Sequence, residues 1–363
     1  SQPTNVVAGA TMSPAVTVQA QAAGGNPIPT ATNNVTLAIG ANPGGGTLAG
    51  TVTAAAVNGV ATFSTLSLDK AGTGYTLTAA LVPGTPLATS SGFNVTVGVA
   101  TRLAFAAQPT NVGGGATISP AVTVQVQDAG GNLVPLATNS VTLAIGTNAG
   151  GGTLSGTLTV AAVNGVATFS TLSIDKVGTG YTLTAAFLPG TPIATSSAFN
   201  VTPGAATRLA FASQPTNVSS GATIIPAATV LLEDAGGNLV PTATNTVTVA
   251  IGTNPGGGTL AGTLTVAAVS GVATFSTLSL DKAGTGYTLT AAYVPGTPIA
   301  TSSAFNVTAG AATQLAVTTT AAGAVSGAAF TTQPVVAVRD AAGNTVTTSG
   351  ATVTMTVSAG ATV

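Results

Sequence analysis

The residues best suited to chemistry in this chain are its few carboxylates and lysines, which recur in two short motifs. One is the turn Asp128-Ala-Gly-Gly-Asn132, and the other is Asp175-Lys176, which precedes Gly178-Thr179-Gly180. Asp and Asn oxygens can bind Ca²⁺, but one carboxylate per turn falls short of the about six to eight oxygens that Ca²⁺ takes. Ala22 also stands at the Asp position in the first copy. The pattern therefore indicates an Asx-type turn with glycine at positive φ.

Catalytic and nucleotide-binding arrangements find no support in the sequence. Histidine and cysteine are absent, so the commonest general base, the usual triad partner and any disulfide are missing. The loop Gly150-Gly151-Gly152 lacks the following Lys and helix of a phosphate-binding loop. We therefore expect a protein that is not an enzyme, with no catalytic residues, no metal and no cofactor.

The charge content limits the possible partners. The 363 residues carry six basic and seven acidic side chains, a net charge of −1, and only 4% of them are charged, against about 25% in typical domains. No basic patch for nucleic acid or anionic lipid is present. Apolar residues are interleaved with Thr, Gly and Pro, and no run approaches the ~18–20 residues of a spanning helix. We expect no nucleic-acid partner and no membrane insertion.

The stretch 164–186 positions these motifs and occurs three times, beginning at Asn58, Asn164 and Ser270. Asn164-Gly165 supplies the two positive-φ positions of a type I′ hairpin. A strand is predicted from Val166 to Ile174, then a Gly-rich corner at 178–180, then a strand that begins at Tyr181. A Tyr just past such a corner is typical of the tyrosine corner of immunoglobulin-like sandwiches.

One place breaks the strand pattern. Phe169 and Leu172 are three residues apart, so they cannot share a face of a regular strand. Either a bulge near Ser170 or an early strand end is expected there.

An internal repeat of 106 residues sets the domain organisation. Gln2-Pro3-Thr4-Asn5 recurs at Gln108 and at Gln214, and 108 − 2 = 106 and 214 − 108 = 106. A period of this length suits an autonomous domain rather than a solenoid unit. The predicted domains are 1–100 (first strand missing), 101–206, 207–312 and a partial, divergent 313–363. We expect these residues to be a window on a longer chain.

The sequence of each complete copy predicts an all-β domain. Val122, Val124 and Val126 alternate with polar residues, as in a half-buried strand. About seven such strands follow one another with a turn signal every ~8–12 residues, including a turn at Pro189-Gly190-Thr191-Pro192. The predicted fold is a tandem array of immunoglobulin-like seven-stranded β-sandwiches, and the short Pro-containing linker 201–206 favours a semi-rigid rod.

Five motifs in order carry a family resemblance. They are Val122-Thr-Val, Asp128-Ala-Gly-Gly-Asn132, Gly151-Gly-Thr-Leu-Ser-Gly156, Asn164-Gly-Val-Ala-Thr-Phe169 and Lys176-Val-Gly-Thr-Gly-Tyr-Thr-Leu-Thr184. In this series the chain resembles bacterial Ig-like (Big) domains of the invasin and intimin type, over nearly its whole length. The resemblance implies a sandwich at the cell surface or in the extracellular matrix that serves as stalk, adhesin or filament, without shared catalytic residues. The fourth copy departs from the pattern at 321–332.

Three functions are compatible with this reading. The first is a non-catalytic extracellular rod, stalk or filament. The second is an adhesin stalk whose binding tip lies outside this sequence, and the third is an accessory region of a secreted hydrolase.

Partners and modifications follow from the surface composition. The edge strands 101–106 and 193–202 carry one charge, Arg102, although edges are normally protected by charge. We expect neighbouring copies of the chain or sugars to cover them. Formal N-glycosylation sequons begin at Asn34, Asn94, Asn200, Asn217 and Asn306, and chance occurrence in a Thr-rich chain is the default explanation. A Lys–Asn isopeptide bond is not expected, because the lysines lie at predicted exposed corners.

Counting strands places the charges at the junctions between copies. Successive loops alternate between the two poles of a sandwich, so the Asp-Lys corner of one copy should face the Asp-Ala-Gly-Gly-Asn turn of the next. Surface ion pairs of this kind are worth only ~0.2–1 kcal/mol, and simple solvated corner charges are the alternative. The predicted inter-domain pairs are Lys70 with Asp128, Lys176 with Asp234, Lys282 with Asp340, Arg102 with Asp69, and Arg208 with Asp175.

Overall fold

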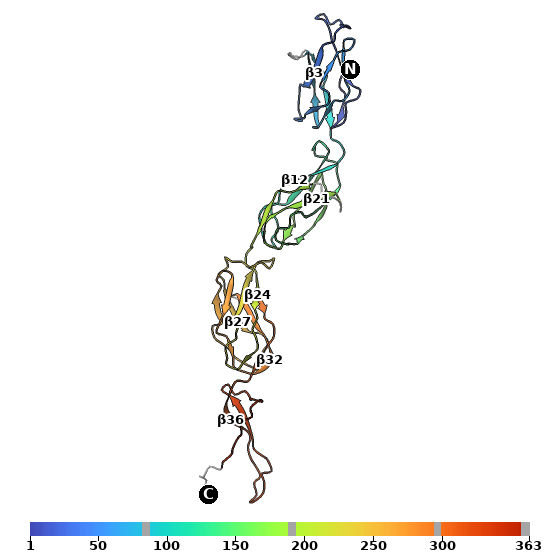
Figure 1. Cartoon of the computed structure of the whole chain (residues 1–363). Coiled ribbons are helices and arrows are strands. Elements are labelled where there is room, and N and C mark those ends of the chain that lie inside the picture. Colours follow the sequence, from blue (N-terminus) through green and yellow to red (C-terminus); the bar gives the residue numbers. More distant parts are fainter. Residues whose placement is uncertain (82–87, 188–193, 294–298, 357–363) are drawn as a thin grey trace. The chain divides into compact units, whose positions relative to one another are not determined.

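The computed structural model describes residues 1–81, 88–187, 194–293 and 299–356 (Figure 1). Those residues form strands, turns and bends, and they contain no helix. The chain divides into two compact units, Ser1–Val112 with Thr117–Thr202 and Gly113–Ala116 with Pro203–Val363. The expected turn at Pro189-Gly190-Thr191-Pro192 lies outside the described residues.

The strands of residues 1–202 follow the 106-residue period. Those of the first copy are β1 (Val6–Val7), β2 (Val16–Gln19), β3 (Asn34–Ile39), β4 (Leu48–Ala49), β5 (Thr53–Ala55), β6 (Val60–Phe63), β7 (Ser67–Leu68), β8 (Gly72–Tyr75), β9 (Leu77–Leu81), β10 (Ala88–Thr89) and β11 (Phe93–Thr96). Those of the second copy are β12 (Arg102–Ala107), β13 (Val112–Gly113), β14 (Val122–Gln127), β15 (Ser140–Ile145), β16 (Leu154–Ser155), β17 (Thr159–Ala161), β18 (Val166–Phe169), β19 (Ser173–Ile174), β20 (Gly178–Tyr181), β21 (Leu183–Phe187), β22 (Ala194–Thr195) and β23 (Phe199–Thr202).

The remaining strands repeat the same order. Those of the third copy are β24 (Arg208–Ser213), β25 (Val218–Ser219), β26 (Ala228–Glu233), β27 (Thr246–Ile251), β28 (Leu260–Ala261), β29 (Thr265–Ala267), β30 (Val272–Phe275), β31 (Ser279–Leu280), β32 (Gly284–Tyr287), β33 (Leu289–Tyr293), β34 (Ile299–Thr301) and β35 (Phe305–Thr308). The fourth copy has β36 (Ala312–Thr319) and β37 (Val335–Asp340) among its described residues.

Each complete copy is a two-layer sandwich. In the second copy one layer has the order β12-β14-β18, and the other contains β17-β15-β21-β22 and β13-β23-β20. The first strand of a copy serves both layers, as the third copy shows: β24 pairs antiparallel with β26, and β25 pairs parallel with β35. Pro215 lies between these two segments, where a ladder hydrogen bond is not needed. The all-β, Ig-like prediction is confirmed.

The alternating residues fill the space between the layers. Val122, Val124 and Val126 are fully buried from one layer, and Leu143 and Leu183 are buried from the other. The described residues form three separate hydrophobic cores in this way, with buried residues between positions 8 and 95, 103 and 201, and 209 and 307. Each core therefore draws its buried side chains from one copy of the repeat.

The predicted hairpin is confirmed in all three copies. Asn164 and Gly165 have φ values of 51° and 76°, and Val163 and Val166 exchange both main-chain hydrogen bonds at 2.9 and 3.0 Å. Ser270 takes the same conformation at 51°. The serine therefore occupies a position that Asn tolerates better.

The strand predicted from Val166 to Ile174 is shorter than expected. β18 ends at Phe169, and β19 begins at Ser173 and pairs with β16 instead of β14. Phe169 and Leu172 are both fully buried. Of the two alternatives the early strand end is correct, because the chain changes partner strand at Ser170 and so turns both side chains inward.

The predicted Gly-rich corner needs correction. Residues 178–181 form strand β20, which pairs with β23 with a register shift between Thr179 and Tyr181, and Gly180 has φ +88°. The tyrosine corner is nevertheless present, because the buried Tyr181 hydroxyl donates to the Lys176 carbonyl at 2.9 Å. The ring lies 6.1 Å from Phe199. The same bond joins Tyr75 to Lys70 and Tyr287 to Lys282.

The first and fourth copies expose positions that are covered in the other two. β2 pairs with β6 alone, whereas the equivalent β14 also pairs with β12. Val18 is half-buried, whereas its equivalent Val124 is fully buried. In the fourth copy Leu315 and Val317 of β36 are 60% and 57% exposed. The exposure differs because the sheets of these two copies have fewer neighbouring strands among the described residues.

The tyrosine corner gives a matched test of stability. Tyr181→Phe removes a buried donor and leaves the Lys176 carbonyl without it, so we expect the second copy to lose about 1–3 kcal/mol. Hydrogen–deuterium exchange of peptides containing Val177 or Phe187, which occur only in that copy, measures the loss. Tyr293→Phe, followed in third-copy peptides that contain residue 293, is the control, because the buried Tyr293 hydroxyl has no partner among the described residues. Equal effects of the two variants would contradict the assignment.

Candidate functional site

The Asp-Lys corner of the first copy is held rigidly by its own domain. The Tyr75 hydroxyl donates to the Lys70 carbonyl at 2.9 Å. The Asp69 carboxylate accepts from the Thr47 amide at 2.6 Å, which fastens the triple-glycine loop to the corner. These bonds leave the Asp69 carbonyl, the Ala71 amide and the Lys70 ammonium directed away from the first copy.

The turn 128–132 of the second copy is organised around a buried carboxylate. Asp128 is 1% exposed. One of its oxygens accepts from the Asn132 amide at 2.9 Å, and both accept from the Asn132 side-chain nitrogen at 2.9 Å. Gly131 has φ +76°, which closes the turn. The Asx-type turn predicted from the sequence is present, and its carboxylate fixes the side chain of Asn132.

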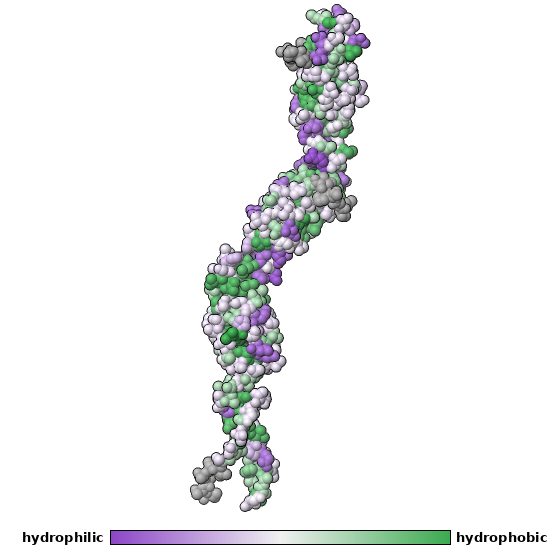
Figure 2. Space-filling view, in the orientation of Figure 1, coloured by the Kyte–Doolittle hydropathy of each residue, from purple (hydrophilic) through white to green (hydrophobic). Residues whose placement is uncertain are grey.

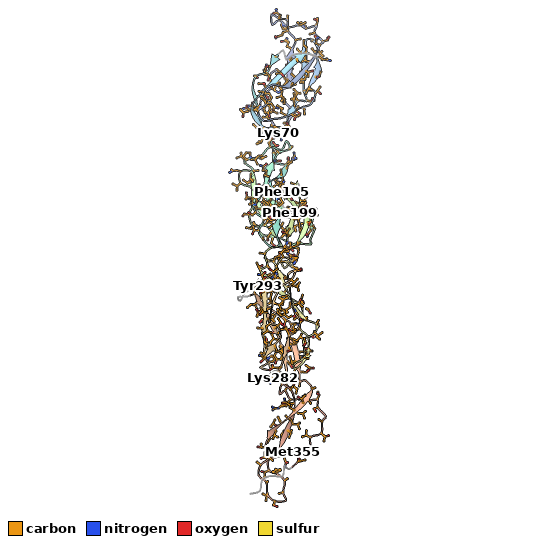
Figure 3. The ribbon with its side chains drawn as sticks, turned by 90° about the vertical axis from the view of Figure 1, so that its left-hand side faces the viewer. Lys70, Phe105, Phe199, Lys282, Tyr293 and Met355 are labelled. Carbon is orange, nitrogen blue, oxygen red and sulfur yellow. The ribbon has the colours of Figure 1, made fainter. Side chains whose placement is uncertain are left out.

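Asn132 joins the turn to the corner. Its Nδ2 donates to the Asp69 carbonyl at 2.8 Å, and its Oδ1 accepts from the Ala71 amide at 3.0 Å. The side-chain amide thus pairs with the main chain of the other copy as one β-strand pairs with another. Lys70, labelled in Figure 3, adds a third bond from Nζ to the Gly130 carbonyl at 2.7 Å.

Close approach of the two main chains requires glycine at position 130. A Cβ there would lie 2.0 Å from the Asp69 carbonyl oxygen, a distance that real Cβ atoms do not tolerate. Glycine at this position therefore serves docking, since Gly131 supplies the positive φ.

The linker between the copies is bound by the same carboxylate. The Gly98 amide donates to Asp128 Oδ2 at 2.8 Å. Asp128 therefore holds both the linker and the Asn132 side chain. The corner 69–71, the turn 128–132 and Gly98 are together called the junction site below.

The predicted ion pairs of this junction are replaced by main-chain contacts. Lys70 reaches the turn but bonds the Gly130 carbonyl, because the Asp128 oxygens are already occupied by N–H donors. Arg102 donates to the Ala129 carbonyl at 3.3 Å and not to Asp69, whose carboxylate is taken by the Thr47 amide. Lys70 is half-buried rather than exposed.

The second unit contains the same site between the third and fourth copies. Asn344 Nδ2 donates to the Asp281 carbonyl at 2.8 Å, and its Oδ1 accepts from the Ala283 amide at 2.9 Å. Lys282, also labelled in Figure 3, donates to the Ala342 carbonyl. Asp340 is 2% exposed and accepts from the Gly310 amide at 2.8 Å. As in the first unit, the lysine bonds a carbonyl and not the Asp340 carboxylate.

The other predicted pairs would join the two compact units, and they stay predictions. Asp234 is fully buried and accepts from the Gly204 and Asn238 amides at 2.9 Å. The Asp175 carboxylate accepts from the Thr153 amide at 2.6 Å. Lys176 is half-buried, and Arg208 begins β24 as an exposed residue.

Burial and hydrogen bonding act in opposite directions on the carboxylates of the site. Burial raises the pKa of Asp340, but hydrogen bonds from the Asn344 side chain and from the Gly310, Asn344 and Ala342 amides outweigh it and lower the pKa to about 2. For Asp128 the donors are Gly98, Asn132 and Gly130, and the net pKa is again lowered. Both groups are therefore ionised at neutral pH despite their burial.

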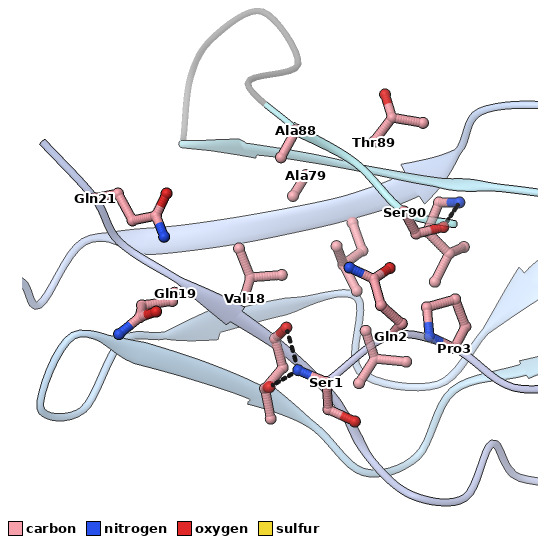
Figure 4. Close-up of a pocket in the computed structure, with 14 residues that line it drawn as sticks. Ser1, Gln2, Pro3, Val18, Gln19, Gln21, Ala79, Ala88, Thr89 and Ser90 are labelled. Carbon is pink, nitrogen blue, oxygen red and sulfur yellow. Dashed lines mark hydrogen bonds between the residues drawn. The ribbon is translucent and has the colours of Figure 1, made fainter. Parts of the chain in front are cut away.

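A shallow pocket of the first copy offers no ionisable side chain. It has a volume of about 280 Å³ and lies between Val18 and Gln19 on one side and Ala79 and Ser90 on the other (Figure 4). In the second and third copies, β12 and β24 lie against β22 and β34 in the equivalent place. The pocket is the space beside an edge strand rather than a reaction site.

The described residues provide few other candidates. They contain no group of three or more His, Cys, Asp or Glu side chains that could hold a metal. No helix among them is long and apolar enough to cross a membrane. The visible surface is largely pale, with both hydrophobic and hydrophilic patches scattered over it (Figure 2). Few strongly hydrophilic areas are expected in a chain with 4% charged residues.

Sequence reasoning missed the residues that make most of the contacts. Asn132, Gly130 and Gly98 were not singled out as junction residues, although the recurrence of Asp-Ala-Gly-Gly-Asn with the repeat period was visible. Opposite charges could not reveal these residues, because an asparagine side chain that binds main-chain groups carries no charge.

The lowered pKa values predict that acid loosens the junction site. A carboxylate whose pKa falls on folding, as that of Asp128 does, stabilises the folded contact above its ordinary pKa of 3.8 and loses this contribution as the pH falls through the lowered pKa. Spin labels on Thr62→Cys and Thr168→Cys, both exposed in a chain without native cysteine, report the distance between the first two copies. The distance distribution should broaden as the pH falls below 3.8.

Asp128→Asn provides the control for this titration. The variant should show a broad distribution already at pH 7 and no further change with acid, while circular dichroism shows folded sandwiches. An unchanged narrow distribution at pH 2 in the original chain would contradict the role of the carboxylate.

Comparison with known proteins gives little further information. No family model and no curated protein matches the sequence. Among solved structures, the Escherichia coli adhesin FdeC shows 21% identity and a TM-score of 0.30, covering 85% of this chain and 95% of that one. Domains 4–9 of the surface-layer protein SbsC show 18% identity and a TM-score of 0.23, covering 86% of this chain and 45% of that one.

Enzymes are found among the similar structures as well. A Bacteroides vulgatus β-glycosidase shows 15% identity and a TM-score of 0.24, covering 57% of this chain and 25% of that one. With TM-scores this low, none of these similarities carries an argument about function.

Proposed function

We propose that the chain is a non-catalytic spacer of the cell surface or extracellular space, built from β-sandwich repeats whose junctions are fixed by docking. The observation that carries the proposal is the junction site, which appears with the same atoms in both units. A repeated domain with a built contact to its neighbour serves the relative placement of domains. The predicted stalk, rod or filament role is the finer form of this proposal.

The energetics favour docking over loose tethering. Each neutral hydrogen bond contributes about 0.5–1.5 kcal/mol, and bonds to charged groups contribute about 1.5–3 kcal/mol. In the junction of the first unit, Asn132 donates one bond to the corner and accepts one from it, Lys70 donates a third, and the linker amide of Gly98 donates a fourth to Asp128. Several bonds closed at once restrain orientation far better than one exposed ion pair.

Composition and resemblance support the proposed location. The surface depends on Thr, Ser, Asn and Gly rather than on ions, and the resemblance to bacterial Ig-like domains implies an extracellular setting. Sugar attached to these side chains remains part of the proposal and would show as added mass on the native protein.

Removing the central amide should loosen the junction. In the chain labelled at Thr62→Cys and Thr168→Cys, Asn132→Ala deletes both bonds to the corner, so we expect a much broader distance distribution. Asn26→Ala is the matched control, because this residue closes the equivalent turn of the first copy and is exposed. If Asn132→Ala leaves the distribution as narrow as Asn26→Ala does, the proposed docking role is wrong.

Neighbouring chains are the proposed cover for the edge strands. Among the described residues β12 pairs with one strand, β14, and it presents the exposed Ala106 at a register shift. We expect sedimentation velocity to show association that grows with concentration, and Ala106→Lys to weaken it, because a charge opposes edge pairing. Thr142→Lys, on the central strand β15, should not. Purely monomeric, unglycosylated chains at high concentration would contradict this part of the proposal.

A further inference from the structure

The two junctions described differ at two positions that face the same carbonyl. In the first unit the turn has Gly130, and the position equivalent to Ser220 is Ala8. In the second unit the turn has Ala342 in place of glycine, and the facing position is Ser220. Both differences lie at the Asp carbonyl of the corner, Asp69 in one unit and Asp281 in the other.

The added methyl group of Ala342 has a physical cost. A Cβ placed on Gly130 would meet the Asp69 carbonyl oxygen at 2.0 Å, so the geometry of the first junction cannot accept alanine without a local shift. The second junction nevertheless keeps both bonds between Asn344 and the corner, at 2.8 and 2.9 Å. The second junction therefore accommodates the methyl group through a local difference in geometry, and it also has a connection that the first junction lacks.

Ser220 supplies that additional connection. Its hydroxyl donates to the Asp281 carbonyl at 2.6 Å and accepts from Asn344 Nδ2 at 2.9 Å. The serine thus bonds both the corner carbonyl and the docking side chain. Ala8, its equivalent, has no hydroxyl and is 8% exposed. We infer that Ser220 and Ala342 form a matched pair that determines the contact geometry of this junction. The geometry of each junction then depends on which residues its own two repeats have at these positions.

This inference rests on the proposed docking function, and it adds a specificity-determining position to it. The position equivalent to Ser220 selects which turn residue a junction accepts: a small apolar residue goes with glycine, and a hydroxyl goes with alanine.

Hydrogen–deuterium exchange on the full chain tests the pair. The amides of Ala71 and Ala283 each donate to a docking Asn, and peptides that extend to Leu81 or Tyr293 distinguish the two otherwise identical corners. Ser220→Ala should lower protection at Ala283 about fivefold, the equivalent of one hydrogen bond, and leave Ala71 unchanged. Ser219→Ala, at the exposed neighbouring residue, is the control and should change neither.

The reciprocal exchange tests the matching itself. Gly130→Ala should lower protection at Ala71, and adding Ala8→Ser should restore part of it. Unchanged protection at Ala283 in Ser220→Ala, or no recovery in the double variant, would overturn the inference.

The variant Asn344→Ala distinguishes a failure of this inference from a failure of the docking proposal. If Asn344→Ala lowers protection at Ala283 and Ser220→Ala does not, only the matched pair is wrong. If neither variant changes the protection at Ala283, the docking proposal fails as well.

Discussion

The pairing of one asparagine amide with the main chain of the preceding repeat is the interaction on which the junctions depend. Asn132 donates to the Asp69 carbonyl and accepts from the Ala71 amide, so it satisfies two groups that the tyrosine corner has placed at the end of the domain. The carboxylate of Asp128 orients the Asn132 side chain by accepting from its Nδ2, and it also accepts from the linker amide of Gly98. Folding of each domain therefore prepares both halves of the contact.

This way of joining domains suits a chain with few charges. Contacts between amides and main chain do not depend on ion pairs, which salt screens at the surface. Lys70 reaches across the contact and bonds a carbonyl oxygen. Carbonyl oxygens are also ligands of calcium ions. The lysine thus places a positive charge between the turn and the corner as part of the polypeptide itself.

Much of the fold was predictable because it follows from local rules. The hairpin at Asn164-Gly165, the alternation of Val122, Val124 and Val126, and the tyrosine corner each depend on residues close in sequence. The break after Phe169 was predictable only as two alternatives, since the change of partner strand is a tertiary event. The corner at 178–180 was wrong, because Gly180 forms a bulge within a strand and does not end one.

The junction site was less accessible to sequence reasoning. Charges drew attention to Lys70 and Asp128, but the atoms that meet are carbonyl oxygens, amides and Asn132. Asp128 can pair with Lys70 only if N–H groups of the folded turn leave its carboxylate oxygens free. The number of such N–H donors cannot be derived from the composition. The burial of Asp128 and Asp340 was unexpected for the same reason.

Scalar coupling across hydrogen bonds measures the central contact most directly. In the uniformly labelled, deuterated chain, a long-range HNCO experiment should show a cross-peak between the Ala71 amide nitrogen and the side-chain carbonyl carbon of Asn132. The hydrogen bond from the Ala162 amide to the Asn139 carbonyl, 3.0 Å long, provides an internal reference for detection. A spectrum that shows the reference coupling but no Ala71–Asn132 cross-peak would contradict docking by the asparagine amide.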